Sequence, residues 1–223
     1  LKLHNKVAAR DAFKFASECA FDKAIQEDAF FNYAKLSFDV NKDISQFEKY
    51  SEMYPSNDKA KEINTYMSIA YLTNKDYASA IDIMHKVENP TDDVLDNLQK
   101  ANMLRAVQLM NNGGYRSAMA YLNEAINIGG NKAITNLCNY YLAECYYRNN
   151  QFERAIEIQN SLATSSQFKR TAEYEFLFYN LGYSYFKQND FQSATRMFDN
   201  YISTLPSKGS IDKDARLRLA DSY

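Results

Sequence analysis

Residues that break helices are scarce in this sequence. Its 223 residues include three prolines, six glycines and no tryptophan. Proteins rich in β-structure need many turn residues between short strands, so this scarcity disfavours a β-sandwich or β-barrel. Aromatic side chains are abundant instead, with 18 tyrosines and 14 phenylalanines, and 46% of all residues are hydrophobic. The composition therefore favours helices packed on helices around a sizeable core.

Cysteine is rare as well. Cys138 and Cys145 are expected on one helix, where seven residues span roughly 10 Å, and a disulfide needs Cα atoms within about 7 Å. With Cys19 they complete the three cysteines of the chain, and no CxxC pair occurs. Neither a zinc site nor a redox dithiol is indicated. We expect all three cysteines to be small, buried apolar residues.

The sequence has no excess of either charge and no long apolar run. Lysine and arginine number 26 against 28 acidic residues, for a net charge of -2. Without a basic stripe, nucleic acid is not an expected partner. No segment approaches the ~18 apolar residues that cross a bilayer, so direct membrane insertion of this chain is not expected. Because the sequence begins with Leu1 rather than methionine, we expect it to be a fragment of a longer protein.

Catalytic and cofactor motifs are missing too. The two histidines, His4 and His85, have no partner at metal-binding or catalytic spacing, and we expect His85 at a solvent-facing or inter-helix position. HExxH and GxSxG do not occur. The glycine pairs within residues 111–114 and 128–131 lack the spacing of a phosphate-binding loop and indicate turns. We therefore predict no enzyme, no cofactor and no metal.

A spaced set of residues recurs along the chain. From Gly182 it reads Gly–x2–Tyr–x8–Ala–x3–Phe–x2–Tyr–x4–Pro, and similar sets start at residues 68, 106 and 143, separated by 38, 37 and 39 residues. Each set predicts two antiparallel helices, with small residues where the helices approach closely and aromatic residues packed around them. The predicted structural anchors are Ala34, Tyr71, Ala80, Ala106, Ala118, Ala143, Tyr146, Ala155, Gly182, Tyr185, Ala194, Phe198 and Pro206.

This pattern resembles the tetratricopeptide repeat (TPR) over nearly the whole chain. The anchor spacing exceeds the family's usual period of about 34 residues. The resemblance implies an all-α fold, an α–α superhelix of about five full helical hairpins with half-repeats at both ends. The expected single domain, 1–223, divides into units at roughly 1–20 (half), 24–55, 59–90, 93–129, 132–166, 169–206 and 212–223 (half). Asp76 and Asp190 are expected to cap second helices, and the uncapped ends favour a homodimer.

In the family, the first helix of each hairpin lines the concave side of the superhelix, and this implies a groove rich in tyrosine. Its expected residues are Tyr140, Glu144, Tyr147, Arg148, Phe176, Tyr179, Asn180, Tyr183, Phe186 and Lys187. Some family members bind a terminal carboxylate. Asn180 and Arg218 match two of the residues that those members use. Glu144 and Asp214, however, are acidic at positions where that ligand needs amide or basic groups. We expect Tyr179→Ala and Tyr183→Ala to weaken any groove ligand and to leave the fold nearly intact.

The leading functional hypothesis is a non-catalytic scaffold that binds a peptide or a partner protein through this groove. The stretches FFNYAKLSF, YYLAECYYRNNQFERAI and DARLRLADSY resemble long TPR proteins of Bacteroidetes. That resemblance implies a periplasmic or envelope-associated setting and a role in envelope assembly. Two alternatives remain open: a module that binds carbohydrate or another small ligand, and a sensor domain of a cytoplasmic regulator.

Overall fold

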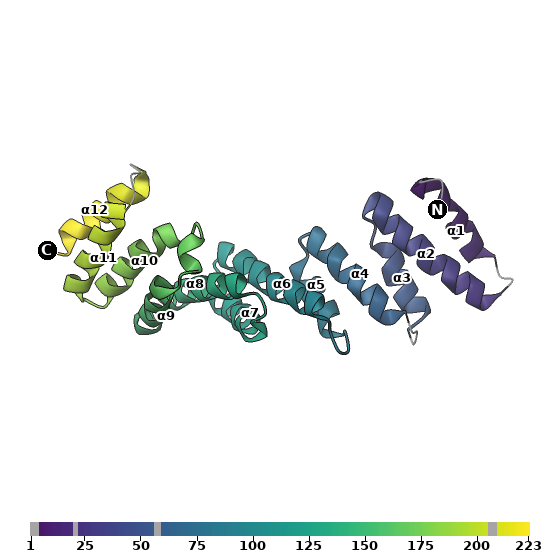
Figure 1. The fold of residues 1–223 in the computed structure, drawn as a ribbon, viewed down its shortest axis with the longest axis horizontal. Coiled ribbons are helices and arrows are strands. Elements are labelled where there is room, and N and C mark those ends of the chain that lie inside the picture. The colour runs from purple at the N-terminus through teal and green to yellow at the C-terminus, as the bar shows by residue number, and fades with distance from the viewer. Residues whose placement is uncertain (1–4, 20–21, 56–58, 205–208) are drawn as a thin grey trace. The chain divides into compact units, whose positions relative to one another are not determined.

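The computed structural model describes residues 5–19, 22–55, 59–204 and 209–223, without the side chains of residues 60 and 61. These residues form helices and no strand, which confirms the all-α prediction (Figure 1). The helices are α1 (Lys6–Glu18), α2 (Lys23–Asn41), α3 (Ser45–Met53), α4 (Ala60–Thr73), α5 (Tyr77–His85), α6 (Asp92–Asn111), α7 (Tyr115–Ile128), α8 (Lys132–Arg148), α9 (Phe152–Thr164), the 3-10 turn η1 (Phe168–Arg170), α10 (Tyr174–Lys187), α11 (Phe191–Thr204) and α12 (Ser210–Asp221).

The helices pair as the repeat predicts. The five hairpins are α2–α3, α4–α5, α6–α7, α8–α9 and α10–α11, with α1 and α12 as half-repeats at the two ends. The chain divides into two compact units, Leu1–Val94 and Leu95–Tyr223, and the division falls in the first turn of α6.

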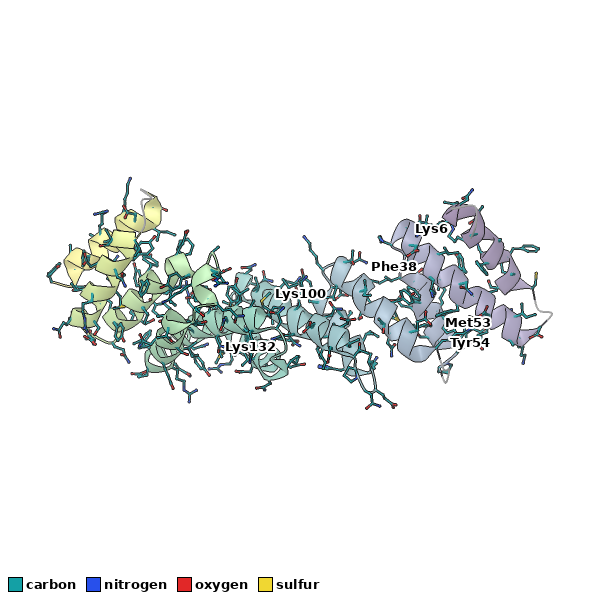
Figure 2. The ribbon with its side chains drawn as sticks, viewed as in Figure 1. Lys6, Phe38, Met53, Tyr54, Lys100 and Lys132 are labelled. Carbon is teal, nitrogen blue, oxygen red and sulfur yellow. The ribbon has the colours of Figure 1, made fainter. Side chains whose placement is uncertain are left out.

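The first unit packs around aromatic side chains of α2, α3 and α4. Phe38, labelled in Figure 2, lies with its ring centroid 6.1 Å from that of Phe47. Phe47 in turn stacks on Tyr66 at 5.5 Å. The buried residues of this core are Phe31, Ala34, Phe38, Phe47, Tyr50, Ile63, Met67 and Ala70.

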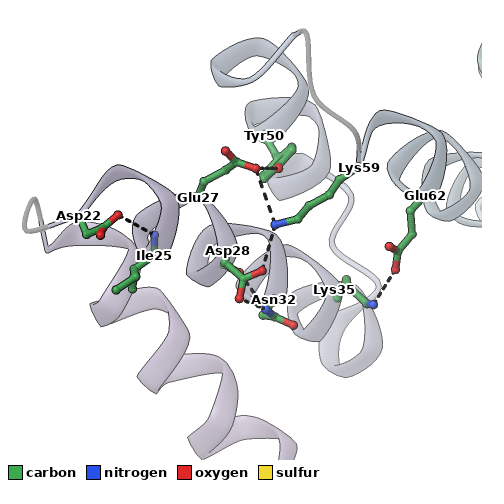
Figure 3. Close-up of polar contacts among 9 residues, drawn as sticks. All are labelled: Asp22, Ile25, Glu27, Asp28, Asn32, Lys35, Tyr50, Lys59 and Glu62. Atoms are coloured by element: carbon green, nitrogen blue, oxygen red, sulfur yellow. Dashed lines mark hydrogen bonds and ion pairs between the residues drawn. The ribbon is translucent and has the colours of Figure 1, made fainter.

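Lysine side chains connect α2 to α4 at the surface of the first unit (Figure 3). Lys59 Nζ lies 3.0 Å from Asp28 Oδ1, and Lys35 Nζ lies 2.8 Å from Glu62 Oε1. Both ammonium groups also lie 5.0 Å from the centroid of the Phe31 ring. Exposed ion pairs contribute roughly 0–1 kcal/mol each, so the aromatic core provides most of the stability of this unit.

The second unit has three successive cores. Each core combines buried residues of one hairpin with residues of a neighbouring helix, as expected for a repeat array. The first contains Ala106, Ala118, Leu122, Ala125, Cys138, Leu142 and Cys145. The second contains Ile156, Leu162, Phe168, Leu177 and Leu181, and the third contains Ala194, Phe198, Tyr201 and Ala215.

The predicted small anchors are buried. The anchors with no exposed surface are Ala34, Ala80, Ala106, Ala118, Ala143, Ala155, Ala194 and Phe198, and Gly182 is buried as well. The anchor tyrosines Tyr71, Tyr146 and Tyr185 are half-buried. Pro206 lies outside the described residues, as does His4.

The turns inside four of the five hairpins share one backbone conformation. In α4–α5, α6–α7, α8–α9 and α10–α11, the residue before the second helix is preceded by a residue with positive φ: 61° at Lys75, 76° at Gly113, 58° at Asn150 and 63° at Asn189. The next N–H then donates to the carbonyl oxygen five residues back, a Schellman bond. These bonds run from Asp76 to Tyr71 (2.9 Å), Gly114 to Leu109 (2.8 Å), Gln151 to Tyr146 (2.9 Å) and Asp190 to Tyr185 (3.0 Å). The residues that accept these bonds stand at the second position of the repeat pattern, three residues after its first small residue. They are Tyr71, Leu109, Tyr146 and Tyr185.

The expected caps are confirmed. Asp76 Oδ1 accepts from Ser79 N at 3.2 Å, and Asp190 Oδ1 accepts from Ser193 N at 3.0 Å. Asp92 begins α6. His85 is exposed, also as expected.

One cysteine departs from the prediction. Cys138 and Cys145 are buried and free, but Cys19 is exposed. Cys19 follows the last residue of α1 as its C-cap and donates its thiol to Phe15 O at 3.3 Å. It lies beyond the helix stripe that packs on α2, so the expectation of a buried Cys19 is wrong.

Candidate functional site

A small cavity lies between the first helices of two successive hairpins of the second unit. It has a volume of about 260 Å³. We call it the tyrosine pocket, defined by Glu144, Tyr147, Arg148, Gln159, Tyr179, Asn180 and Tyr183. Residues 144, 147 and 148 share one face of the last turn of α8, since side chains three and four apart are neighbours on a helix. Residues 179, 180 and 183 share the facing side of α10.

The α8 wall of the pocket carries an ion pair. Arg148 Nε donates to Glu144 Oε1 at 2.6 Å, and this bond raises the pKa of the guanidinium. The same guanidinium lies 5.6 Å from the Tyr115 ring and 6.0 Å from the Tyr147 ring. Glu144 and Arg148 therefore neutralise each other and hold Arg148 against two aromatic faces.

On the other side, α12 holds the two tyrosines of α10. The Tyr179 hydroxyl donates to Asp214 Oδ2 at 2.8 Å, and the Tyr183 hydroxyl donates to the same oxygen. Arg218 Nε donates to the Tyr183 oxygen at 3.1 Å. Burial, followed by the bond to Asp214, raises the pKa of Tyr179 above its ordinary value. Both phenols therefore stay protonated at neutral pH and act as donors.

Amide side chains form the floor of the pocket. Asn180 Nδ2 donates to the Tyr140 hydroxyl at 3.0 Å, and burial raises the pKa of Tyr140 to about 12. Gln159 from α9 is buried and accepts from Ser184 Oγ at 3.0 Å. These bonds fix the orientation of both amides.

The structure brings six of the ten groove residues predicted from the sequence into this one pocket: Glu144, Tyr147, Arg148, Tyr179, Asn180 and Tyr183. Tyr140 contacts it through Asn180 but packs its ring on Phe168, with centroids 5.7 Å apart. Phe176 and Phe186 pack against the core of α11 and α12, and Lys187 is exposed away from the pocket.

Three residues of the site were absent from the predicted set. In the repeat pattern, Gln159 stands at the position where the set that starts at Gly182 has Phe198. A glutamine at a position expected to hold a buried aromatic residue could have pointed to it. Asp214 and Arg218 lie on the half-repeat α12, 31 or 35 residues after the tyrosines that they contact.

The ring contacts of Tyr179 and Tyr183 change the expected effect of truncating them. Tyr179 contacts Phe198 at 6.3 Å and Tyr201 at 5.4 Å between centroids, and Tyr183 contacts Phe198 at 5.5 Å. Alanine at either position would open the core of the last hairpin. These contacts argue against the expectation that the truncations leave the fold nearly intact, and phenylalanine is the better replacement because it keeps the ring.

The described part of the chain was also considered for a metal site and for a membrane-spanning helix. No group of three or more histidine, cysteine, aspartate or glutamate side chains is arranged there to hold a metal ion. None of the described helices is both long and apolar enough to pass through a bilayer.

Comparisons with known proteins agree with the architecture. The family model described as tetratricopeptide repeat matches residues 138–164 and 177–207. The search of curated proteins found no match. Among solved structures, the chain is similar to YrrB, described as a TPR protein with an unusual peptide-binding site, at 17% identity and a TM-score of 0.51, over 97% of this chain and 98% of that one.

Two further structures resemble the chain less closely. BtubC (BKLC) from P. vanneervenii has 17% identity and a TM-score of 0.48, over 96% of this chain and 91% of that one. The TPR2AB domain of yeast Sti1, in a complex with pHSP90, has 17% identity and a TM-score of 0.44, over 96% and 98%. The matched segments fall on the last two hairpins, and the similarity to YrrB extends the same fold over nearly the whole chain.

Proposed function

We propose that the protein binds an extended peptide segment of a partner protein, and that the tyrosine pocket receives a side chain of that segment. The observation that carries the proposal is the convergence of six predicted groove residues, from two successive first helices, on one cavity. Repeat proteins use such continuous surfaces to bind other proteins.

The size and lining of the pocket suit a peptide side chain. Its volume of about 260 Å³ is below the ~300–1,000 Å³ of pockets that enclose a whole small ligand. Tyrosines 147, 179 and 183 are half-buried and offer rigid apolar area with a polar end. Since Glu144 and Arg148 already neutralise each other, the pocket favours an uncharged or aromatic side chain over a free carboxylate.

The test selects random-sequence peptides on the intact chain and measures their affinity by fluorescence anisotropy. Tyr147→Ala removes one wall of the pocket and should weaken the selected peptides about tenfold or more. Tyr185→Phe is the matched control, because Tyr185 lies on α10, does not line the pocket and bonds to Asn160 instead, at 3.0 Å. Selected peptides that bind Tyr147→Ala as tightly as the wild type would contradict the proposal.

We also propose that the protein acts in the cell envelope. The support is the resemblance of three stretches of the sequence to long TPR proteins of Bacteroidetes. Cell fractionation of the source organism, followed by detection with an antibody, tests this: the proposal expects recovery with periplasmic or membrane fractions. Recovery with the cytoplasmic fraction would favour the regulatory alternative.

A further inference from the structure

A second, larger cavity lies in the α8–α9 hairpin, separate from the tyrosine pocket. Its volume is about 480 Å³, and it is an open hollow, because its lining residues Arg154, Glu157 and Ser161 are exposed. The two cavities share no lining residue. On α8 the second cavity uses Asn136, Asn139 and Tyr146, whereas the tyrosine pocket uses Glu144, Tyr147 and Arg148. The helix therefore presents a different face to each cavity.

Seven of the nine residues that line the second cavity carry a polar group. Ile158 and Leu162 are its only apolar lining residues, and the others carry amide, hydroxyl or charged groups. Pockets for apolar ligands have the opposite balance, with few polar groups in a hydrophobic lining. A ligand that fills this cavity must therefore offer many hydrogen-bonding groups of its own, because unpaired polar groups lose their water on binding.

Much of the hydrogen-bonding capacity in this cavity is not used within the protein. Among the described residues, the Glu157 carboxylate, the Tyr146 hydroxyl and the Ser161 hydroxyl make no side-chain hydrogen bond or ion pair. The Asn136 amide donates to Ser165 Oγ at 3.3 Å and the Asn139 amide donates to Thr135 O at 3.0 Å, so both carbonyl oxygens remain as acceptors.

The tyrosine pocket differs in this respect. There, Glu144 is paired with Arg148, and the hydroxyl of Tyr183 is bonded to Asp214. The carboxylate of the tyrosine pocket on α8 is thus paired, whereas the Glu157 carboxylate of the larger cavity has no such partner among the described residues.

Charge narrows the ligand class further. Arg154 and Glu157 are the charged lining residues, and their formal charges cancel. The Arg154 guanidinium lies 5.5 Å from the centre of the Tyr146 ring and donates to Gln151 Oε1 at 3.4 Å. Guanidinium and carboxylate groups both form paired hydrogen bonds with two neighbouring polar atoms, and adjacent hydroxyls of a sugar ring supply such pairs.

We propose that this cavity binds a neutral, polyhydroxylated ligand of the size of one or two sugar rings. Amide carbonyls, Glu157 and the free hydroxyls bond its hydroxyl groups, while Ile158 and Leu162 contact its C–H face. The site is independent of the peptide-binding function proposed above, because it uses no residue of the tyrosine pocket.

The test titrates the intact chain with a defined panel and detects binding by saturation-transfer NMR and calorimetry. The probes are glucose, galactose, mannose, N-acetylglucosamine, maltose, cellobiose and myo-inositol, with gluconate and glucosamine as charged comparators. The proposal expects at least one neutral probe to bind at concentrations up to about 10 mM and to bind more tightly than both charged probes. No binding by any neutral probe, or tighter binding of a charged one, would overturn it.

Two substitutions on α9 test whether the sugar binds in this cavity. Glu157→Gln keeps the side-chain shape and disturbs no bond in the described structure, so folding should be unaffected. It should weaken the bound sugar about fivefold or more, because hydrogen bonds to charged groups are the stronger ones. Glu153→Gln, the same change at an exposed position of the same helix outside the cavity, should leave the affinity unchanged.

Two further outcomes decide between this cavity and the alternatives. Equal loss of affinity in Glu157→Gln and Glu153→Gln, or loss in Tyr147→Ala instead, would place sugar binding elsewhere and overturn the assignment. If the peptides selected for the tyrosine pocket compete with the bound sugar and lose affinity in Glu157→Gln, the cavity is part of the peptide site and the proposal fails.

Discussion

Gly182 lies directly against the ring of Phe198. A Cβ atom built on Gly182 would come within 2.7 Å of two carbon atoms of that ring, closer than side chains pack. Both residues are buried, Gly182 in α10 and Phe198 in α11. The glycine in the middle of an apolar helix is therefore required by the aromatic ring of its partner helix, and this contact sets how closely the last hairpin closes.

Substituting Gly182 tests this contact. Alanine is favoured over glycine in a helix by about 1 kcal/mol, but overpacking a core costs about 1–3 kcal/mol. We expect Gly182→Ala to lower the free energy of unfolding, and Gly182→Leu to lower it by more, as measured by urea denaturation. In a Phe198→Leu background the penalty of Gly182→Ala should shrink, because the ring is gone. An equal penalty in both backgrounds would show that Phe198 is not the cause.

Gly113 tests the shared turn. Its φ is 76° and an added Cβ would have no neighbour within 4 Å, so any cost of Gly113→Ala comes from the backbone alone. Left-handed backbone costs a residue with a Cβ about 1–2 kcal/mol, and we expect a loss of that size in chemical denaturation. Asn112→Ala, one residue earlier and without positive φ, is the control. Equal stability of Gly113→Ala and wild type would argue against the turn conformation.

The cap of α11 should make stability depend on pH. The backbone N–H of Ser193 donates to Asp190 and lowers the pKa of that carboxyl. A lowered folded pKa means that the stabilisation is present above the unfolded value of about 3.9 and is lost as pH falls through the folded value. Asp190→Ala should cost about 1 kcal/mol at neutral pH, and its difference from wild type should narrow below about pH 4.

Asp199→Ala serves as the matched control for the cap, since Asp199 is exposed on the same helix. Thermal melts at a series of pH values give the comparison. A difference between Asp190→Ala and wild type that stays constant down to strongly acidic pH would show that the carboxylate is not the capping group.

The three thiols should react at very different rates. Burial raises the pKa of both Cys138 and Cys145 to about 12, so these thiols are almost entirely protonated at pH 8, and the thiolate is the reactive form. Cys19 is exposed. We expect a thiol reagent to label one cysteine quickly in the native protein and all three in denaturant. Rapid native labelling in a Cys19→Ser variant would contradict the buried positions of the other two.

Local patterns in the sequence were enough to predict the helices and their pairing. The positions of Ala80, Ala118 and Ala155 follow from spacing alone, because a helical period of 3.6 residues fixes which side chains share a face. The caps at Asp76 and Asp190 follow from residue type for the same local reason. Neighbours within one or two helical turns decide each of these features.

The sequence by itself thus determined an array of helical hairpins with small residues at their crossings and tyrosines on the first helices. Only the tertiary structure decided which tyrosine hydroxyl groups are already hydrogen-bonded within the protein. It brought Asp214 of α12 to the hydroxyls of Tyr179 and Tyr183, placed buried Gln159 in the pocket, and placed Glu157 of α9 beside Asn136 and Asn139 of α8 in a second cavity. The physical reason is that hydrogen bonds and cavities depend on residues tens of positions apart, whose distances are set by how the helices pack.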